Sequence, residues 1–301
     1  MRAISTSLFV ALSGLLFGAT CLSAESLLAY SHLTDQFWQI WSMDLDDKEP
    51  RQLTSSPFDK RHPAWLEAGK KIMFRTNNGQ LYILDLVTQK EEQILLKFGQ
   101  VSDPDWSQAT KLLTFARFSP NLVDESEIWT IQLDGSEQRV ITNLPGLQYH
   151  PDFSPDGSKI AYVSGKGPGQ HEIWTMDRDG TNPSRLTENP SGYDLFPDWS
   201  PDGKKIAFVS DKKGSLDIWV TDEADKTQKQ LTDYSGLDTC PAWSPDGRHI
   251  LFASNQGGDL QIWMVDYLSG KQDQITYGPG ESREPACVSG EPFKGEAGRD
   301  H

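Results

Sequence analysis

Residues 150–164 read HPDFSPDGSKIAYVS, and this stretch decides the fold because close copies of it follow later in the chain. The copies are FPDWSPDGKKIAFVS at residues 196–210 and CPAWSPDGRHILFAS at residues 240–254. Weaker copies begin at His62 and Asp103, and a shortened copy begins at Glu284. These six copies form an internal repeat, which is the feature that decides the fold class.

A second motif recurs behind the first one, again once in each unit. It is an Ile-Trp pair or a close variant, and its first residues are Ile40, Leu81, Ile128, Ile173, Ile218 and Ile262. Each unit contains segments of strand length that are rich in β-branched and aromatic residues, and none shows sustained helical periodicity. Units of about 40–50 residues with four strands each are typical of a β-propeller.

The turns and the edges of each unit agree with this prediction. Pro-Asp-Gly, as at 155–157, forms a tight hairpin between the first two strands because Gly accepts a positive φ. The first strand contains a Pro, which is tolerated at a sheet edge such as the one facing a propeller channel. The fourth strand carries charged residues such as Arg139 and Lys229, which discourage pairing with other sheets.

The repeat is circularly shifted along the chain. The segment 27–31, LLAYS, corresponds to the second strand of a unit, and the missing first strand appears only at 283–287. We therefore expect an all-β, six-bladed propeller of four-stranded antiparallel blades over residues 25–290. In this ring the C-terminal strand pairs into the N-terminal blade, and residues 291–301 form a polar tail.

The N-terminal residues predict export. Arg2 precedes an apolar stretch at 8–17, and the small residues of 22–24 offer a cleavage site, so residues 1–24 read as a signal peptide. The protein is then periplasmic or secreted. An alternative is a lipoprotein that is anchored through Cys21. No later stretch approaches the ~18 apolar residues of a membrane-spanning helix.

The formal net charge of −15 disfavours nucleic acids and anionic membrane surfaces as partners. Metal ions, cationic ligands or basic protein patches suit this charge, although it also serves solubility alone. Cys240 and Cys287 are the cysteines that follow the predicted signal peptide. An oxidising compartment permits a disulfide between them, and two separate small core residues are the other interpretation.

The SPDGxxIAFxS core followed by Asp-Ile-Trp resembles the propeller repeat of TolB, and related repeats occur in prolyl oligopeptidase-type peptidases and some sugar lyases. The resemblance is strongest over 148–277 and weaker before it. It implies a periplasmic protein that binds a partner of the cell envelope, such as a Pal-like lipoprotein, over the mouth of its propeller. TolB carries an α/β domain before the propeller, whereas here about three residues separate Ala24 from the first strand. The resemblance therefore concerns the propeller only.

The residues on either side of the strand-one Pro are the candidate site. Residues two apart in a strand point to the same side, so these positions of all blades should converge on the channel. The polar side chains among them are His62, Asp103, Asp105, His150, Asp152, Asp198 and Glu284. They suit a basic peptide segment, or a Ca²⁺ ion held by Asp105, Asp152 and Asp198. A water-filled channel without a ligand is the alternative.

Four Trp residues occupy positions whose side chains point to the opposite side of the first strand, and they should pack between blades. They are Trp65, Trp106, Trp199 and Trp243. The sequence contains no nucleophile elbow, zincin motif, phosphate loop or dinucleotide fingerprint. We therefore expect a monomeric, non-catalytic module that binds a protein or peptide in the cell envelope. Two alternatives stay open: a carbohydrate-active hydrolase or lyase that uses the channel carboxylates, and a purely structural envelope scaffold.

Overall fold

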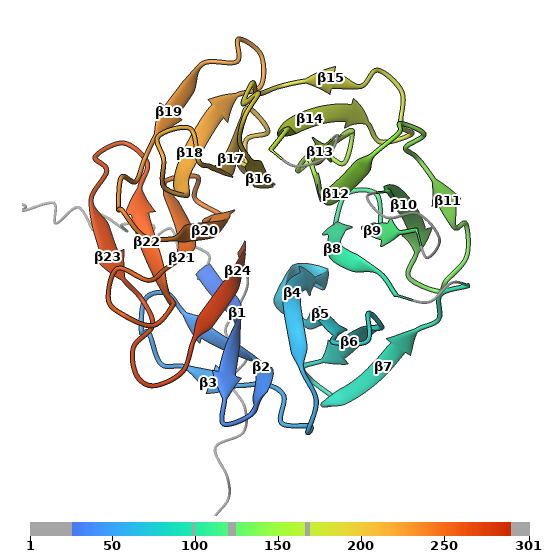
Figure 1. Cartoon of the computed structure of the whole chain (residues 1–301). Helices are drawn as coiled ribbons and strands as arrows, with labels where there is room; N and C mark the ends of the chain where they lie inside the picture. The colour runs from blue at the N-terminus through green and yellow to red at the C-terminus, as the bar shows by residue number, and fades with distance from the viewer. Residues whose placement is uncertain (1–25, 98–99, 120–124, 166–168, 290–301) are drawn as a thin grey trace, which may run out of the picture.

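Six four-stranded antiparallel sheets lie around a common axis like the blades of a propeller (Figure 1). This computed structural model describes residues 26–97, 100–119, 125–165 and 169–289. The predicted six-bladed fold of four-stranded antiparallel sheets is confirmed. The predicted signal peptide with Cys21 and the predicted tail 291–301 lie outside the described residues.

Blade 1 combines strands from both ends of the described chain. Its order, from the inside outward, is β24 (Ser282–Ser289), β1 (Ser26–Thr34), β2 (Phe37–Asp44) and β3 (Arg51–Gln52). In the antiparallel ladder between β24 and β1, Leu28 pairs with Cys287 and Ala29 with Ala286. Figure 1 shows the red strand beside the blue ones.

The other five blades follow the order of the chain, each from its innermost to its outermost strand. Blade 2 contains β4 (Lys60–Leu66), the 3-10 helix η1 (Glu67–Gly69), β5 (Lys71–Thr76), β6 (Leu81–Asp85) and β7 (Lys90–Ile94). Blade 3 contains β8 (Ser102–Ser107), β9 (Leu112–Phe118), β10 (Ser126–Gln132) and β11 (Arg139–Val140). Blade 4 contains β12 (Leu147–Phe153), β13 (Lys159–Gly165), β14 (His171–Asp177) and β15 (Ser184–Arg185). Blade 5 contains β16 (Asp194–Trp199), β17 (Lys205–Ser210), β18 (Asp217–Asp222) and β19 (Gln228–Gln230). Blade 6 contains β20 (Asp238–Trp243), β21 (His249–Ser254), β22 (Gln261–Asp266) and β23 (Gln272–Gln274).

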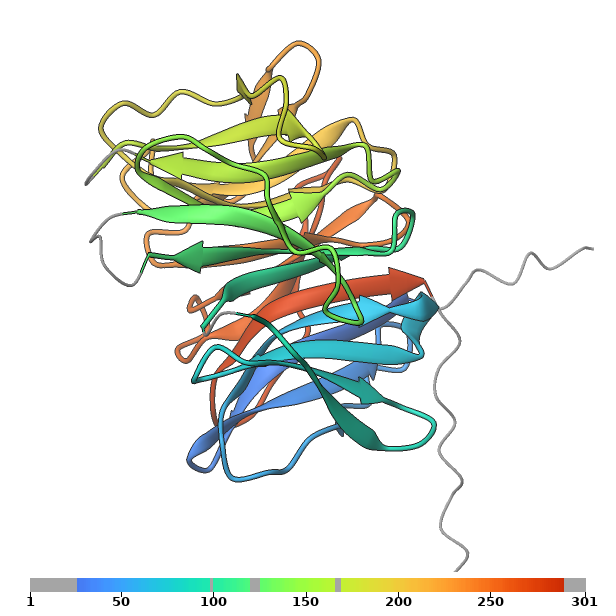
Figure 2. The same cartoon turned by 90° about the vertical axis from the view of Figure 1, so that its right-hand side faces the viewer.

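The ring has two distinct faces. The turn face carries the hairpins between first and second strands, such as 154–157, and the paired ends Ser26 and Ser289. The linker face lies on the opposite side and carries the segments that lead from each fourth strand to the next blade. Figure 2 shows β24 running across the thickness of the ring and ending on the turn face.

The Ser-Pro-Asp-Gly hairpins are held by their own side chains. In blade 4, Ser154 Oγ donates to Asp156 Oδ1 at 2.7 Å, and the Gly157 N–H donates to the Ser154 carbonyl at 2.7 Å. Gly157 has φ 67°, and a Cβ on it would lie 2.5 Å from the side chain of Thr110 in blade 3. Both the left-handed backbone and the close neighbour therefore require glycine.

The Leu-Thr and Ile-Thr endings of five units cap the third strand. Each Thr hydroxyl accepts the N–H of the Ile in the Ile-Trp motif at 2.8–3.0 Å, in the pairs Thr54–Ile40, Thr142–Ile128, Thr187–Ile173, Thr232–Ile218 and Thr276–Ile262. The hydroxyl satisfies a buried donor that would otherwise cost stability. The repeated Thr thus has a structural role that the sequence did not reveal.

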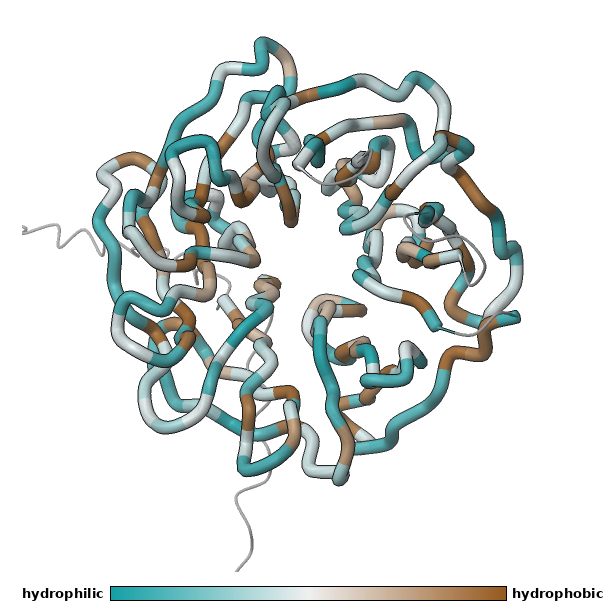
Figure 3. Tube along the Cα trace, viewed as in Figure 1, coloured by the Kyte–Doolittle hydropathy of each residue, from teal (hydrophilic) through white to brown (hydrophobic). Residues whose placement is uncertain are grey.

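The apolar core lies between neighbouring blades. The predicted packing of the four Trp residues is confirmed, because each contacts apolar side chains of the preceding blade. Trp243 packs against Ala207 and Val209 of blade 5, and Trp106 packs against Leu66 and Met73 of blade 2. Figure 3 shows hydrophobic positions on the inner strands, while the outer strands β7, β15 and β19 are mostly hydrophilic.

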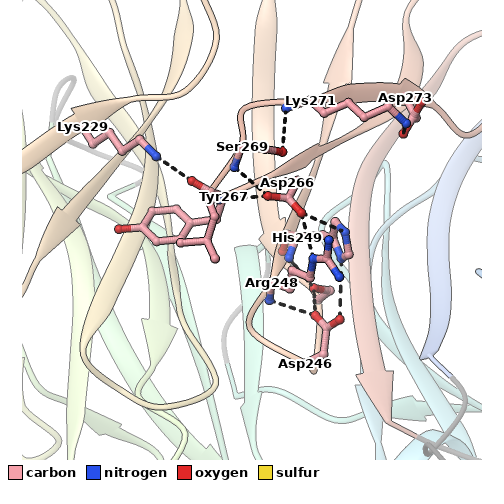
Figure 4. A network of polar contacts seen from close by, with 11 residues as sticks. Lys229, Asp246, Arg248, His249, Asp266, Tyr267, Ser269, Lys271 and Asp273 are labelled. Carbon is pink, nitrogen blue, oxygen red and sulfur yellow. Dashed lines mark hydrogen bonds and ion pairs between the residues drawn. The ribbon is translucent and has the colours of Figure 1, made fainter.

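Polar contacts join the outer parts of blades 5 and 6 (Figure 4). The Asp266 carboxylate accepts the Ser269 N–H at 2.8 Å and Arg248 Nε at 2.8 Å, so it holds two turns of blade 6 together. These hydrogen bonds lower the pKa of Asp266. Lys229 of blade 5 donates to the Tyr267 carbonyl at 2.6 Å and lies 4.7 Å from the centre of its ring. The outer strands thus also connect one blade to the next.

Candidate functional site

Each first strand contains a β-bulge at the residue before its Pro. These six residues have left-handed φ values of 47–55° and are His62, Asp103, His150, Phe196, Cys240 and Glu284. In blade 4 the pairing passes from Tyr149–Val163 to Asp152–Ala161, so the first strand contains one residue more than its partner. Left-handed backbone is unfavourable for residues other than Gly. Because the bulge recurs in every blade, it is a regular structural feature of the channel wall.

The seven predicted site residues all line one cavity of about 530 Å³. The cavity also contains the strand-one Pro residues of every blade, and it is lined toward the turn face by Gln108, Pro201 and Pro245. The residues predicted from strand parity therefore lie around the channel. The bulge was not predicted, and it turns the residue after the Pro toward the next blade.

Three of the carboxylates bind the backbone of the following blade. Asp105 accepts the Phe153 N–H at 2.9 Å, Asp152 accepts the Trp199 N–H at 2.7 Å, and Asp198 accepts the Trp243 N–H at 2.7 Å. We call such a contact between a channel carboxylate and the next blade's backbone a carboxylate clasp. Blades 2, 6 and 1 have Ala64, Ala242 and Ala286 at this position and cannot form it. The Asp residues thus have a structural role in addition to any binding role.

The same three carboxyl groups hold protons more tightly than ordinary Asp residues. Burial raises the pKa of Asp105 to about 6 and that of Asp198 to about 7. Burial, together with the charges of Asp105 and Asp198, raises the pKa of Asp152 well above its usual value. A buried carboxyl resists ionisation because the charged form loses its hydration. The carboxyl groups of Asp105, Asp152 and Asp198 are therefore partly protonated near neutral pH.

Glu284 lines the channel with only 7% of its surface exposed. Its carboxylate accepts Ser31 Oγ at 2.7 Å, Arg61 at 2.5 Å and the His62 N–H at 2.8 Å. Burial raises the pKa of Glu284, but the His62 and Arg61 charges outweigh it and bring the pKa to about 2. Glu284 forms a second kind of carboxylate clasp, from blade 1 to blade 2.

Asp103 forms a carboxylate clasp of the same kind between blades 3 and 4. It accepts Ser102 Oγ at 3.0 Å and the His150 N–H at 3.4 Å, and it lies 3.6 Å from His150 Nε2. Burial opposes the ionisation of Asp103, but nearby His150 and His62 lower its pKa. Burial lowers the pKa of His150, whose ring stacks on Phe196 at 3.9 Å.

The two described cysteines are free and both line the cavity. Burial raises the pKa of Cys240 to about 12 and also raises that of Cys287, so neither thiol is reactive as a thiolate. Over the described part of the chain, no group of three His, Cys, Asp or Glu side chains is placed to hold a metal ion. The Ca²⁺ site at Asp105, Asp152 and Asp198 stays a prediction without geometric support.

Comparisons with known proteins agree with this geometry. The family model described as TolB beta propeller domain matches residues 31–194 and 188–291. A TolB homolog of Chlorobium luteolum is 26% identical over 62% of this chain, and the match spans 41% of that protein's length. This chain therefore spans less than half of the length of that relative.

Two solved structures extend the comparison. TolB from Acinetobacter baumannii superimposes with a TM-score of 0.78 at 25% identity, over 88% of this chain and 67% of that one. An oligogalacturonate lyase in complex with manganese has a TM-score of 0.60 at 20% identity, over 82% of this chain and 73% of that one. The second likeness shows the fold alone. No helix in the described ranges is long and apolar enough to span a membrane.

Proposed function

Because this chain belongs to the TolB β-propeller family, we propose that it is a non-catalytic module that binds a protein or peptide segment in the cell envelope. We place the binding site at the turn-face mouth of the channel. A periplasmic or secreted location follows from the signal peptide predicted at 1–24, and a Pal-like lipoprotein is the partner that the family suggests. We propose that the protein acts as a monomer.

One observation supports this proposal above the others: the cavity of about 530 Å³ is lined by half-buried carboxyl groups together with Pro and Trp side chains. Asp105, Asp152 and Asp198 have raised pKa values because no cation compensates their burial. A Lys or Arg side chain of a partner would stabilise the ionised carboxylates at short range. Binding should then release protons, so the affinity for a basic segment should rise between pH 5 and pH 7.

The test places a photo-crosslinking amino acid at Gln108, beside this mouth, in the full chain expressed in cells. We expect a partner to be captured there and not by the same crosslinker at Leu268, which lies 78% exposed on the outer part of blade 6. Replacing Asp105, Asp152 and Asp198 together with Asn should reduce the capture at least about tenfold, since each 1.4 kcal/mol corresponds to a factor of ten. Equal capture by the Asn variant would place the site elsewhere.

The carbohydrate-active alternative makes a different prediction for the same residues. Carboxyl groups with raised pKa are typical of general acids, and a glycosidase or lyase would need one of them for its reaction. Under the binding proposal, the purified protein has no activity on a panel of polysaccharides. Activity that disappears in Asp152→Asn would replace the binding proposal with an enzymatic one.

A further inference from the structure

Three arginine side chains lie near the linker-face ends of the strands of blades 1 and 2. Arg61 and Arg283 come from the first strands of blades 2 and 1, and Arg75 is the cross-strand partner of Arg61. The side chains of Arg61 and Arg283 are 30% and 32% exposed. A basic group of this kind is unexpected on a chain with a net charge of −15.

Two of these arginines are fixed in position by one aromatic ring. The guanidinium carbons of Arg61 and Arg283 lie 4.7 Å and 5.4 Å from the centre of the Trp38 ring. Arg61 also donates to Glu284, and Arg283 donates to Glu281 at 2.7 Å. Cation–π contacts and ion pairs together hold both side chains in place. Their charges are largely matched by protein carboxylates.

Arg75 differs because it has no such partner. Within the described ranges its side chain forms no hydrogen bond or ion pair, and its Nε atom, like those of Arg61 and Arg283, is buried without an acceptor. Its charge acts on Asp103, but that carboxylate already accepts Ser102 Oγ and the His150 N–H. Arg75 lines a cavity of about 470 Å³ between blades 2 and 3, together with Gln100, Ser102, Arg117 and Phe118. None of the described residues that line this cavity is acidic. Among the described residues, the cavity thus offers the Arg75 guanidinium with no hydrogen-bonded acceptor.

We propose that this cavity is a carboxylate-binding site for an acidic segment of a peptide or protein, with Arg75 as its main contact. The planar guanidinium matches a carboxylate through two parallel hydrogen bonds. The Gln100 side chain adds a neutral amide donor at the same cavity. An extended polyanion such as a nucleic acid fits poorly, because it needs a broad basic surface and would meet the acidic remainder of the protein. This site is independent of the turn-face mouth.

The test follows the Nε–H NMR signal of Arg75 in the full chain labelled with ¹⁵N-arginine. The first probe is the amidated peptide acetyl-Gly-Glu-Gly-Gly-amide, and the second has Gln in place of Glu. A third probe, acetyl-Gly-Gln-Gly-Gly with a free C-terminus, distinguishes a side-chain carboxylate from a terminal one. We expect saturable shifts with the carboxylate probes and at least about tenfold weaker binding of the uncharged one.

Arg75→Gln assigns the signal by its loss. When binding is followed through the Nε–H signal of Arg117 at the same cavity, this variant should bind at least about fivefold more weakly, whereas Arg178→Gln on the exposed turn face should bind like the wild type. Thermal unfolding of both variants checks the fold. If Arg75→Gln does not fold, the comparison of charged and uncharged probes on the wild type decides whether the cavity binds a carboxylate. Equal binding of those probes overturns the proposal. Tighter binding of inorganic phosphate than of either carboxylate probe overturns it as well.

Discussion

A chain that ends at residue 281 is expected to lose its cooperative unfolding transition. The truncation removes β24, so β1 loses its inner partner strand and blade 1 becomes a three-stranded sheet. It also removes Glu284, which leaves the half-buried Arg61 side chain and the His62 N–H without their acceptor. The combined loss exceeds about 5 kcal/mol, which is comparable to the whole stability of many domains. Circular dichroism during heating measures this effect.

A chain that ends at residue 289 is the matched control, because it keeps every described strand. We expect its melting temperature to equal that of the full chain. Adding a synthetic peptide of residues 282–289 to the shorter truncation should restore part of the transition, since the peptide supplies the missing strand. A normal melting curve for the chain ending at 281 would show that ring closure contributes little.

The contribution of the channel carboxyl groups to the stability of the protein is expected to fall as the pH rises from about 4 to about 7. In the unfolded chain Asp198 ionises near its ordinary pKa of 3.8, whereas in the folded chain its pKa is about 7. Between these values the folded state binds more protons, so each rise in pH favours unfolding. Above pH 7 this contribution is constant. Asp105, with its pKa of about 6, acts in the same direction.

Asp198→Asn should remove much of this dependence. The amide oxygen still accepts the Trp243 N–H, but the side chain stays neutral at every pH. We expect the variant to exceed the wild type by about 2 kcal/mol in unfolding free energy at pH 7.5 and to match it at pH 4.5. Asp259→Asn, at an exposed position, is the control. Parallel pH profiles for the wild type and Asp198→Asn from urea unfolding would refute the role of the buried carboxyl.

Much of the architecture was predictable because it depends on local residue types that recur. The Pro of the first strand, the Gly of the hairpin and the Ile-Trp pair each have a fixed place in a blade, so their spacing gave the number of blades. The register of a regular strand also placed Asp105, Asp152 and Asp198 around the channel. These inferences need only the period of a β-strand and the chemistry of turns.

The remaining features depend on contacts between blades, which no single repeat encodes. The bulge at His150 departs from regular strand geometry, so parity could not show that Asp152 reaches the backbone at Trp199. Arg75 lies near Ser102 only because blades 2 and 3 are neighbours in the ring. A repeated Asp after the Pro, present in three blades and replaced by Ala in the others, was the available signal for the clasps.

The carboxylate clasps are distributed unevenly around the ring. Among the described residues they connect blade 1 to 2, 3 to 4, 4 to 5 and 5 to 6, but they are missing between blades 2 and 3 and between blades 6 and 1. These two boundaries are also where the cavities of about 470 Å³ and 730 Å³ lie. The clasps thus join the blades into one group of two and one group of four, and the two boundaries between these groups lack a clasp. Strain imposed on the ring by a bound partner would therefore deform these two boundaries more than the others.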